Sequence, residues 1–242
     1  MAIPKWLERT ELLIGGDCLE KLAVSNILLV GLGGVGSYAA EFLVRSGIGS
    51  MTIVDGDSVD ETNKNRQLVA LNSTIGKLKT EIMAERLLDI NPALKLNVIS
   101  NFMDVDDMIS LIEAEKFSFA LDCIDSLTPK ITMIKCALLT KTKIICSMGA
   151  GGKLDPTKIQ VADISKTKEC KFAHMVRKIL KKDKIYRGLL TVFSEEIQPK
   201  EALKYTDGRN YKKSYYGTIS YMPALFGLMM ASEVIRRLGD LK

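Results

Sequence analysis

Short apolar runs alternate with longer amphipathic segments along most of the chain. The apolar runs are typical of buried strands, and the amphipathic segments repeat their apolar residues at helical spacing. The predicted strands are 27–30, 51–54, 96–99, 117–121, 143–147, 158–164 and 189–193. The predicted helices are 6–23 (a pair interrupted at Gly15 and Gly16), 38–46, 77–90, 104–115, 129–140, 166–184 and 223–238. This alternation predicts an α/β fold with a doubly wound, mainly parallel sheet, which further strands and helices extend toward the C-terminus.

A glycine-rich loop follows the first predicted strand and opens the next helix. It contains Gly31, Gly33, Gly34, Gly36 and Ser37. The spacing of these glycines allows a tight turn, the close approach of a phosphate, and close packing of helix against strand. The unpaired amides at the helix start carry partial positive charge, which favours an anion. The loop therefore predicts a nucleotide site in a Rossmann-like sheet, used either by a dinucleotide redox enzyme or by another kind of nucleotide-dependent protein.

Carboxylates follow two of the predicted strands. Asp55 ends the second strand roughly 20 residues beyond the glycines, where such sheets hold a ribose hydroxyl, although it could also simply cap a turn. Asp122, Asp125 and Ser126 follow strand 117–121, so we place them in the same crevice as the glycine loop. Asp125 is the stronger candidate for a Mg²⁺ ligand beside a nucleotide triphosphate. Asp122 follows the strand directly and could simply be its last residue, with no role at the site.

A long polar connection joins the second strand to helix 77–90. Its central part, residues 57–67, reads DSVDETNKNRQ, which is long for a compact α/β unit and is therefore expected to be functional. Lys79 falls in the first turn of the helix that follows, where a cation opposes the helix dipole. An anionic partner would explain this placement, and a solvated lysine is the alternative.

Composition narrows the class of protein. The 242 residues are 47% hydrophobic, which is enough for one large domain. We divide it into an N-terminal helical segment (1–25), a nucleotide-binding core (26–148) and a substrate-side extension with a terminal helix (149–242). No apolar stretch is long enough for a signal sequence or a membrane span, so we expect a soluble, cytoplasmic protein that does not associate with membranes.

Cysteines and basic residues add two further expectations. The five cysteines form no C-x-x-C pair and are expected to be reduced and buried, except Cys170, which could be exposed. Segment 166–184 carries eight Lys or Arg against two acidic residues, which indicates either a solvated helix face or a footprint for a polyanion such as RNA. The polar segment 199–216 is expected to be a mobile loop, and the apolar helix 223–238 to close the core or an oligomer interface. The candidate RNA contacts are Lys171, Arg177, Lys178, Lys181 and Lys182.

Several motifs in fixed order resemble a known family. The motifs are Gly31 to Ser37, Asp55-Gly-Asp57, Asn63-Lys-Asn65-Arg66-Gln67, Gly76-Lys-Leu-Lys79 and Asp122-Cys-Ile-Asp125-Ser126. Together they resemble the adenylation domain of the ubiquitin-activating-like (ThiF) superfamily. Later segments are similar to its tRNA threonylcarbamoyladenosine dehydratase branch, namely 149–152, 153–156, 160–163, 192–194 and 217–223.

The resemblance implies roles for individual residues. Asp55 would bind the ribose of ATP, Arg66 and Lys79 would contact the triphosphate, and Asp125 would hold Mg²⁺. Arg9 is similar to an arginine that reaches the partner's phosphates across a dimer interface, so a homodimer is implied. The remaining residues expected at the nucleotide site are Asp57, Asn63, Asn65, Gln67, Asp122 and Ser126.

The resemblance also implies a reaction on tRNA. The threonyl carboxylate of threonylcarbamoyladenosine would be activated as an acyl-adenylate and would then cyclise, with release of AMP and pyrophosphate and net loss of water. The neighbouring carbamoyl group is already in place at high effective concentration, so the enzyme needs no nucleophile of its own. DNA is not an expected partner.

Three rival functions remain open. A sulfur-carrier adenylyltransferase of the thiamine or molybdopterin type shares the motifs, but such proteins commonly carry zinc on two C-x-x-C pairs, and this sequence has none. A nicotinamide dehydrogenase would have no use for Arg66 and Lys79. A non-catalytic RNA-binding scaffold would not need Arg66, Lys79 and Asp125 together. A cysteine desulfurase or sulfur-acceptor partner, with Cys170 as a sulfur relay, also stays open.

Overall fold

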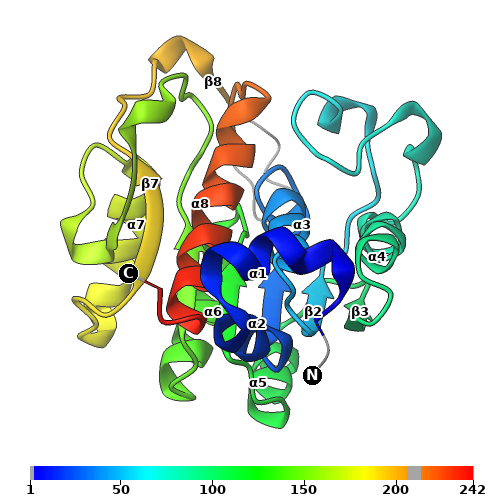
Figure 1. Cartoon of the computed structure of the whole chain (residues 1–242). Coiled ribbons are helices and arrows are strands. Elements are labelled where there is room, and N and C mark those ends of the chain that lie inside the picture. The colour runs from blue at the N-terminus through cyan, green and yellow to red at the C-terminus, as the bar shows by residue number, and fades with distance from the viewer. Residues whose placement is uncertain (1–2, 206–213, 242) are drawn as a thin grey trace.

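A twisted sheet runs through the centre of the protein (Figure 1). The computed structural model describes residues 3–205 and 214–241, and in these residues the sheet has seven strands in the order β3-β2-β1-β4-β5-β7-β6. All neighbours are parallel except β6, which runs antiparallel to β7. The strands are β1 (Asn26–Val30), β2 (Ser50–Val54), β3 (Lys95–Ile99), β4 (Phe119–Asp122), β5 (Ile144–Ser147), β6 (Ile159–Asp163) and β7 (Leu190–Ser194). This order confirms the predicted doubly wound, mainly parallel sheet.

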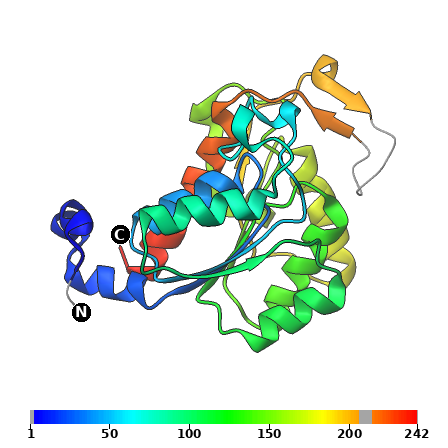
Figure 2. The ribbon, with the colours of Figure 1, turned by 90° about the vertical axis from the view of Figure 1, so that its right-hand side faces the viewer.

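Helices cover both faces of the sheet, as Figure 2 shows edge-on. One hydrophobic cluster joins the sheet to α2 (Gly16–Ala23), α3 (Gly36–Arg45), α4 (Lys79–Ile90) and α8 (Tyr221–Leu238). The other joins it to α5 (Val105–Ala114), α6 (Leu127–Leu139) and α7 (Lys171–Leu180). Among the described residues, no helix is both long enough and apolar enough to cross a membrane.

Short elements connect these helices and strands. The 3₁₀ turns are η1 (Lys5–Leu7), η2 (Glu61–Asn63), η3 (Asn72–Thr74), η4 (Pro156–Lys158), η5 (Ile164–Lys166), η6 (Lys181–Asp183) and η7 (Lys200–Ala202). Strands β8 (Leu203–Tyr205) and β9 (Ser214–Tyr216) pair antiparallel in a separate two-stranded sheet. The segment 199–216, predicted as a loop throughout, therefore contains regular structure at both ends, and its central residues 206–213 lie outside the described part of the chain.

Helices α3, α6 and α8 each begin two residues earlier than predicted, and α3 begins at Gly36. Helix α6 begins at Leu127, with Ser126 as its N-cap, two residues before the predicted start at 129. Helix α8 begins at Tyr221, two residues before Pro223. A proline fits anywhere in a first helical turn, because the amides there have no intrahelical acceptor, so Pro223 marks the turn but not its first residue.

The N-terminal helix pair is interrupted where the sequence indicated, but its two halves differ in burial. Gly15, with φ +83°, separates α1 (Glu8–Ile14) from α2. Leu19 and Leu22 of α2 are buried, whereas Leu12 and Leu13 of α1 are 82% and 84% exposed. Helix α1 therefore buries none of its residues within this chain, although its apolar residues recur at helical spacing.

Helix α8 crosses α3 at very close range. A Cβ added to Gly227 would lie 2.3 Å from the carbonyl oxygen of Val35 and 3.0 Å from the amide of Ala39. Only glycine fits this crossing. The start of α8 is thereby held against the glycine loop, with Pro223 beside Gly34.

Candidate active site

The glycine loop and the end of β2 are joined by one carboxylate. Asp55 Oδ2 accepts a hydrogen bond from the amide of Leu32 at 2.6 Å, and Oδ1 accepts one from the amide of Asp57 at 2.8 Å. Burial raises the pKa of Asp55, while the nearby Lys79 ammonium and these two amides oppose the shift. Asp55 therefore fixes the positions of both loops at the carboxyl ends of β1 and β2.

The glycine loop leaves no space for side chains at its turn. A Cβ on Gly36 would lie 1.7 Å from the carbonyl oxygen of Gly31, so the start of α3 packs directly on the end of β1. The Ser37 hydroxyl forms a hydrogen bond within the same turn, because it donates to the carbonyl of Gly33 at 2.7 Å. The first amides of α3 thus lie above the strand end, where an anion is electrostatically favoured.

Lys79 is held by an anionic partner within the chain. Its ammonium lies 2.7 Å from Asp57 Oδ2, and its amide donates to the carbonyl of Asp57 at 3.1 Å. The Lys79 side chain is only 6% exposed, whereas that of Asp57 is 47% exposed. The cation is therefore fixed by the fold, its carboxylate partner can turn toward solvent, and the solvated-lysine alternative is wrong.

The polar connection after β2 is organised by its own side chains. Asn63 Oδ1 accepts from the amide of Asp60 at 3.2 Å, which makes this amide side chain part of the cap of η2. Arg66 Nη1 donates to the carbonyl of Thr62 at 3.0 Å and to Asn65 Oδ1 at 2.8 Å. Asn65 in turn donates to the carbonyl of Thr218 at 2.9 Å, ahead of α8. The guanidinium of Arg66 is thereby carried on a folded segment and not on a loose loop.

Gln67 is the least satisfied polar side chain of this region. It is buried, and its amide nitrogen would lie 3.8 Å from a Cβ on Gly33. Among the described residues, its Oε1 is the one buried side-chain oxygen or nitrogen that lacks a hydrogen-bond partner. A buried acceptor of this kind costs free energy unless a donor reaches it, so Gln67 fits a position at the edge of a ligand site.

The two carboxylates after β4 have different environments. Asp122 and Lys130 form a fully buried ion pair at 2.6 Å, and Lys130 also donates to the carbonyl of Ser147 at 3.0 Å. Asp125 is exposed and accepts from the hydroxyl of Ser126 at 3.4 Å. Of the two carboxylates predicted to lie in the crevice, Asp125 is therefore the one that can reach it. Asp122 instead links the end of β4 to the end of β5, because its partner Lys130 also donates to Ser147.

Lys130 is a residue that the sequence reasoning missed. A signal was present, because Lys130 precedes Met133, Ile134 and Ala137 at helical spacing, and all three are buried. A lysine on the buried face of a helix requires an anionic partner in the core. The Phe172 ring lies under its ammonium at 5.7 Å, which links α7 to the same pair.

The cysteines supply no reactive thiol at the strand ends. Burial raises the pKa of both Cys123 and Cys146. Cys170, expected as a possible exposed thiol, is buried, and its sulfur accepts from the amide of Ala173 at 3.5 Å as the N-cap of α7. The exposure predicted for Cys170 is therefore wrong.

The predicted RNA contacts separate into two groups. Arg177 ties α7 to η5, because its guanidinium donates to the hydroxyl of Thr167 and, at 3.1 Å, to the carbonyl of the same residue. Lys178, Lys181 and Lys182 are exposed, and Lys171 is exposed at the start of α7. Arg177 thus has a structural role, while the lysines form the basic side of the helix.

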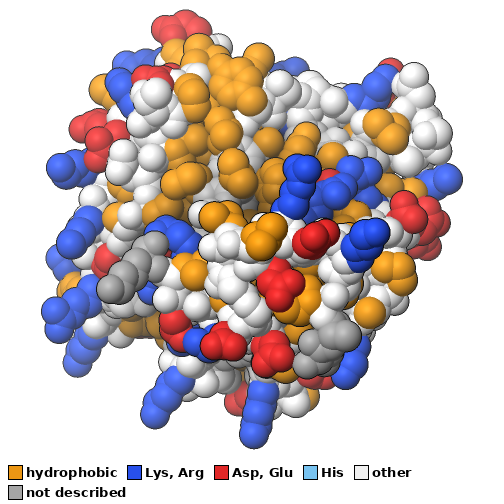
Figure 3. Space-filling model, viewed as in Figure 1, with side chains coloured by type: hydrophobic (Ala, Val, Ile, Leu, Met, Phe, Trp, Pro, Cys, Tyr) orange, Lys and Arg blue, Asp and Glu red, His pale blue; other side chains and the backbone are white. Residues whose placement is uncertain are grey.

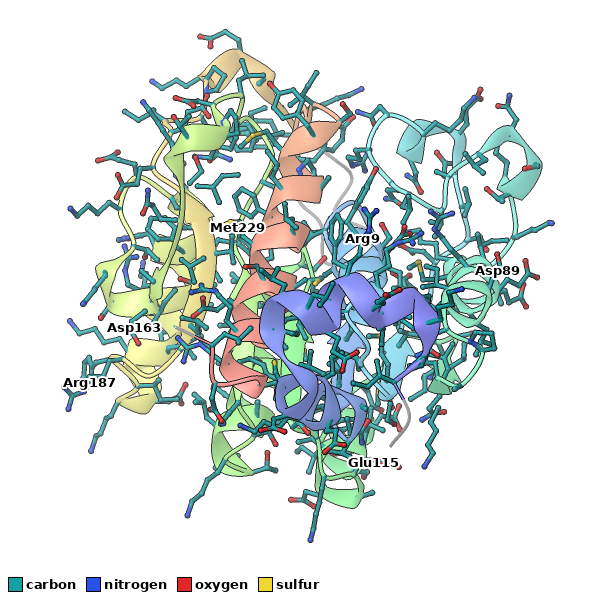
Figure 4. The ribbon with its side chains drawn as sticks, viewed as in Figure 1. Arg9, Asp89, Glu115, Asp163, Arg187 and Met229 are labelled. Carbon is teal, nitrogen blue, oxygen red and sulfur yellow. The ribbon has the colours of Figure 1, made fainter. Side chains whose placement is uncertain are left out.

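An apolar surface lies on the face that carries α8. Figure 3 shows apolar side chains gathered over this helix, and Tyr221 and Leu228 are 43% and 39% exposed. Leu154, whose carbonyl accepts a hydrogen bond from the Tyr221 hydroxyl at 2.9 Å, is 61% exposed. Figure 4 shows Arg9 of α1 on the same face as Met229 of α8. Helix α1, whose Leu12 and Leu13 are also exposed, lies on this face as well, so apolar side chains of both helices face solvent here.

Comparison with known proteins identifies the class. The chain belongs to the ThiF family, which matches residues 7–242. A tRNA threonylcarbamoyladenosine dehydratase of Bacillus subtilis is 38% identical to it, over 94% of this chain and 92% of that protein. The crystal structure of the tRNA N6-threonylcarbamoyladenosine dehydratase of Escherichia coli in complex with ATP has a TM-score of 0.87 and 35% identity, and it covers 99% of this chain and 98% of its own.

A sulfur-carrier enzyme is similar over a shorter region. The molybdopterin-synthase adenylyltransferase of Salmonella typhimurium is 36% identical over 45% of this chain and 43% of its own length. The likeness to the dehydratases extends over nearly the whole chain, including the part after β5. The resemblance inferred from the motifs is thereby confirmed.

The stability of the fold should depend on the buried ion pair of Asp122 and Lys130. Lys130→Met should lower the free energy of unfolding by about 3–5 kcal/mol near neutral pH, because it leaves Asp122 buried and unpaired. Burial raises the pKa of Asp122, and loss of the ammonium should raise it further. A carboxylate whose pKa is raised in the folded state holds its proton there more tightly than in the unfolded state, so the fold loses stability as pH rises through the raised pKa. The loss of unfolding free energy should therefore be smaller at about pH 5 than at about pH 8.

Urea unfolding at the two pH values measures this difference. The matched control is the double variant Asp122→Asn with Lys130→Met, which removes the charge and keeps an acceptor for the amide of Ile124. It should lose less stability and show little dependence on pH. If Lys130→Met lost the same free energy of unfolding at both pH values, Lys130 would not be stabilising the charge of Asp122.

Proposed function

We propose that this chain is an ATP-dependent dehydratase that cyclises threonylcarbamoyladenosine in tRNA through an acyl-adenylate. The carrying observation is that Asp55, Lys79 and Arg66 meet at the glycine loop: Asp55 accepts from Leu32, the Lys79 ammonium acts on Asp55, and Arg66 packs on Gly34. The similarity of nearly the whole chain to tRNA threonylcarbamoyladenosine dehydratases supports the substrate.

ATP would bind with its phosphates at the glycine loop. The first amides of α3 would face the phosphate oxygens, and the close packing of Gly36 on Gly31 leaves that approach free of side chains. Asp55 already accepts from two amides and, as a carboxylate, has lone pairs left for ribose hydroxyls. Asp57, Asn63, Asn65, Gln67 and Ser126 would complete the surroundings of the nucleotide, while Asp122 acts from within the core.

Arg66 and Lys79 would stabilise the transition state of adenylation. Attack of the threonyl carboxylate on the α-phosphate forms the carboxyl–phosphorus bond, breaks the bond to pyrophosphate and builds negative charge on the phosphoryl oxygens. Cations that the fold already holds near those oxygens stabilise this charge without reorganising. Because Asp57 is half-exposed, the triphosphate can take its place beside the buried Lys79 ammonium.

Asp125 fits a Mg²⁺ ion that accompanies the triphosphate. Magnesium is usually held by one or two carboxylates together with phosphate oxygens and water, and Asp125 is an exposed carboxylate at the end of β4. Such an ion would neutralise part of the phosphate charge. The other steps depend on residues of the chain itself.

Cyclisation would need no further catalytic group from the enzyme. The carbamoyl oxygen or nitrogen of the same nucleoside attacks the activated carbonyl, AMP leaves, and the proton lost from the carbamoyl group passes to solvent or phosphate. An intramolecular attack of this kind has a high effective concentration. The raised pKa values of Cys123 and Cys146 are consistent with a route that uses no thiolate.

The tRNA is proposed to lie along α7. Lys171, Lys178, Lys181 and Lys182 are exposed there and can meet phosphates, whereas Arg177 supports the helix. We also propose that the chain divides at residues 25 and 148, and that it acts on tRNA in the cytoplasm. A sulfur-transfer partner has no support in the described residues, because Cys170 is buried.

A homodimer is proposed on the apolar surface that α1 and α8 share. Leu12 and Leu13 are more than four-fifths exposed, which is unfavourable unless another chain covers them. Burying this surface against a second copy would bring Arg9 toward the partner, as the family resemblance implies.

The first test of the function is a mass spectrum of nucleosides from tRNA carrying threonylcarbamoyladenosine, after incubation with the protein, ATP and Mg²⁺. We expect loss of one water from that nucleoside and one AMP for each molecule converted. Arg66→Ala and Lys79→Ala should each reduce the rate by more than about 100-fold, because each removes a preorganised cation.

Matched controls are Lys64→Ala and Lys77→Ala, which remove exposed cations close to each site residue. They should retain near wild-type rates, and circular dichroism should show all four variants folded. AMP release that requires a small diglycine-ended protein, without any change in the nucleoside, would instead make this chain a sulfur-carrier adenylyltransferase.

The dimer is tested by mixing two inactive variants. Arg9→Ala and Arg66→Ala should each be inactive alone, but a refolded mixture should regain about a quarter of wild-type activity, because random pairing gives one complete site in each mixed dimer. If the mixture recovered no activity, Arg9 would act in its own protomer's site or outside catalysis.

The dimer surface is tested separately by the double variant Leu12→Glu with Leu13→Glu, which should sediment as a monomer.

A further inference from the structure

The start of helix α4 lacks a side-chain cap. Its N-cap residue is Leu78, whose side chain cannot accept from the first amides of the helix. Two backbone contacts reach this end of the helix: the amide of Lys79 donates to the carbonyl of Asp57 at 3.1 Å, and Ser58 forms an isolated β-bridge with Leu78. Both contacts come from the polar connection that follows β2.

One further contact of this helix end comes from a different element. Thr80 Oγ1 and Ser100 Oγ lie 2.8 Å apart, and either hydroxyl can donate. Thr80 is fully buried, and Ser100 directly follows β3, which lies beside α4 in Figure 1. A buried hydroxyl that lost its partner would cost free energy, so this pair holds the first turn of α4 on the end of β3.

The end of β3 is in turn fixed to the segment proposed to bind the ribose. The amide of Asp55 donates to the carbonyl of Ile99 at 3.2 Å. Beyond Ser100, Phe102 packs so closely on Gly56 that a Cβ at this glycine would lie 2.7 Å from the Phe102 amide nitrogen. A continuous path of contacts therefore runs from Asp55 through the end of β3 to the first turn of α4.

The ion pair that holds the Lys79 ammonium is the one that the proposed reaction replaces. Asp57 Oδ2 lies 2.7 Å from this ammonium, and the Asp57 side chain is 47% exposed. When the triphosphate takes the place of Asp57, this restraint on the lysine is lost. The hydroxyl pair of Thr80 and Ser100 does not involve Asp57, so the exchange does not break it.

We propose that Thr80 and Ser100 are positioning residues for adenylation. Their hydrogen bond keeps the Lys79 ammonium in place once the triphosphate has displaced Asp57. This inference rests on the proposed function. A preorganised cation stabilises the transition state because it does not have to move as charge develops, and a displacement of about 1 Å can cost about 100-fold in rate. The pair therefore acts through Lys79 and not through a contact of its own with ATP.

The test measures adenylation in Thr80→Val, which keeps the shape of the side chain and removes its hydroxyl. The full chain is incubated with ATP, Mg²⁺ and tRNA carrying threonylcarbamoyladenosine, and AMP release and conversion of the nucleoside are followed together. We expect kcat to fall about 10- to 100-fold. The KM for ATP should stay at the wild-type value, because a displaced cation loses mainly the interaction that forms in the transition state.

Three further variants separate the lost hydroxyl from lost stability. Ser100→Ala removes the other hydroxyl and should give the same fall in kcat, whereas Thr80→Ser keeps its hydroxyl and should retain near wild-type kcat. Thr191→Val is the matched control, because Thr191 is also fully buried and its hydroxyl donates to the carbonyl of Ala162 at 2.8 Å, in β7. It should unfold at a lower urea concentration than the wild type and keep wild-type kcat.

A double variant shows whether Thr80 acts through Lys79. In Lys79→Ala the cation is absent, so adding Thr80→Val should lower its single-turnover rate no further. If Thr80→Val lowered the rate by the same factor in both backgrounds, Thr80 would act by another route and the inference would be overturned.

The outcomes also separate this inference from the proposed function. If the wild type converts the nucleoside and folded Thr80→Val converts it at the wild-type rate, the positioning role is overturned and the proposed function stands. If the wild type leaves the nucleoside unchanged, the proposed substrate fails, and the inference that rests on it fails as well.

Discussion

The two hydrogen bonds that Asp55 accepts hold the site together. One comes from the glycine loop and the other from the start of the polar connection, so a single carboxylate sets the distance between the segments that follow β1 and β2. The position of Lys79 depends on this arrangement, because its partner Asp57 lies two residues from Asp55. The raised pKa of Asp55 reflects the burial that this position requires.

A second constraint acts inside the sheet. The pair of Asp122 and Lys130 joins β4 to β5 and leaves Asp125 as the exposed carboxylate of that strand end. Burying two charges is costly, and the core accepts them only because each satisfies the other. The loop that carries Asp125 is therefore anchored by an interaction that does not itself contact the crevice, and the ring of Phe172 connects this anchor to α7.

Much of the fold followed from local pattern, because glycine spacing and the alternation of strand and helix are encoded within short windows. Asp55 and the glycine loop were predicted together for that reason. The sequence reasoning did not identify the partner of Lys79 and missed Lys130, since each ion pair joins two separate elements of the fold. The exposure of Leu12 and Leu13 was missed because an apolar pattern does not reveal whether the covering surface belongs to the same chain.

Asp55 organises the proposed nucleotide site, and calorimetric titration of ATP tests this role most directly. Asp55→Ala should bind ATP about 10- to 100-fold more weakly, because hydrogen bonds to a charged group are lost. Asp155→Ala, which removes a carboxylate that caps η4, should bind ATP like the wild type. Circular dichroism must show both variants folded. Wild-type affinity in a folded Asp55→Ala variant would contradict the account.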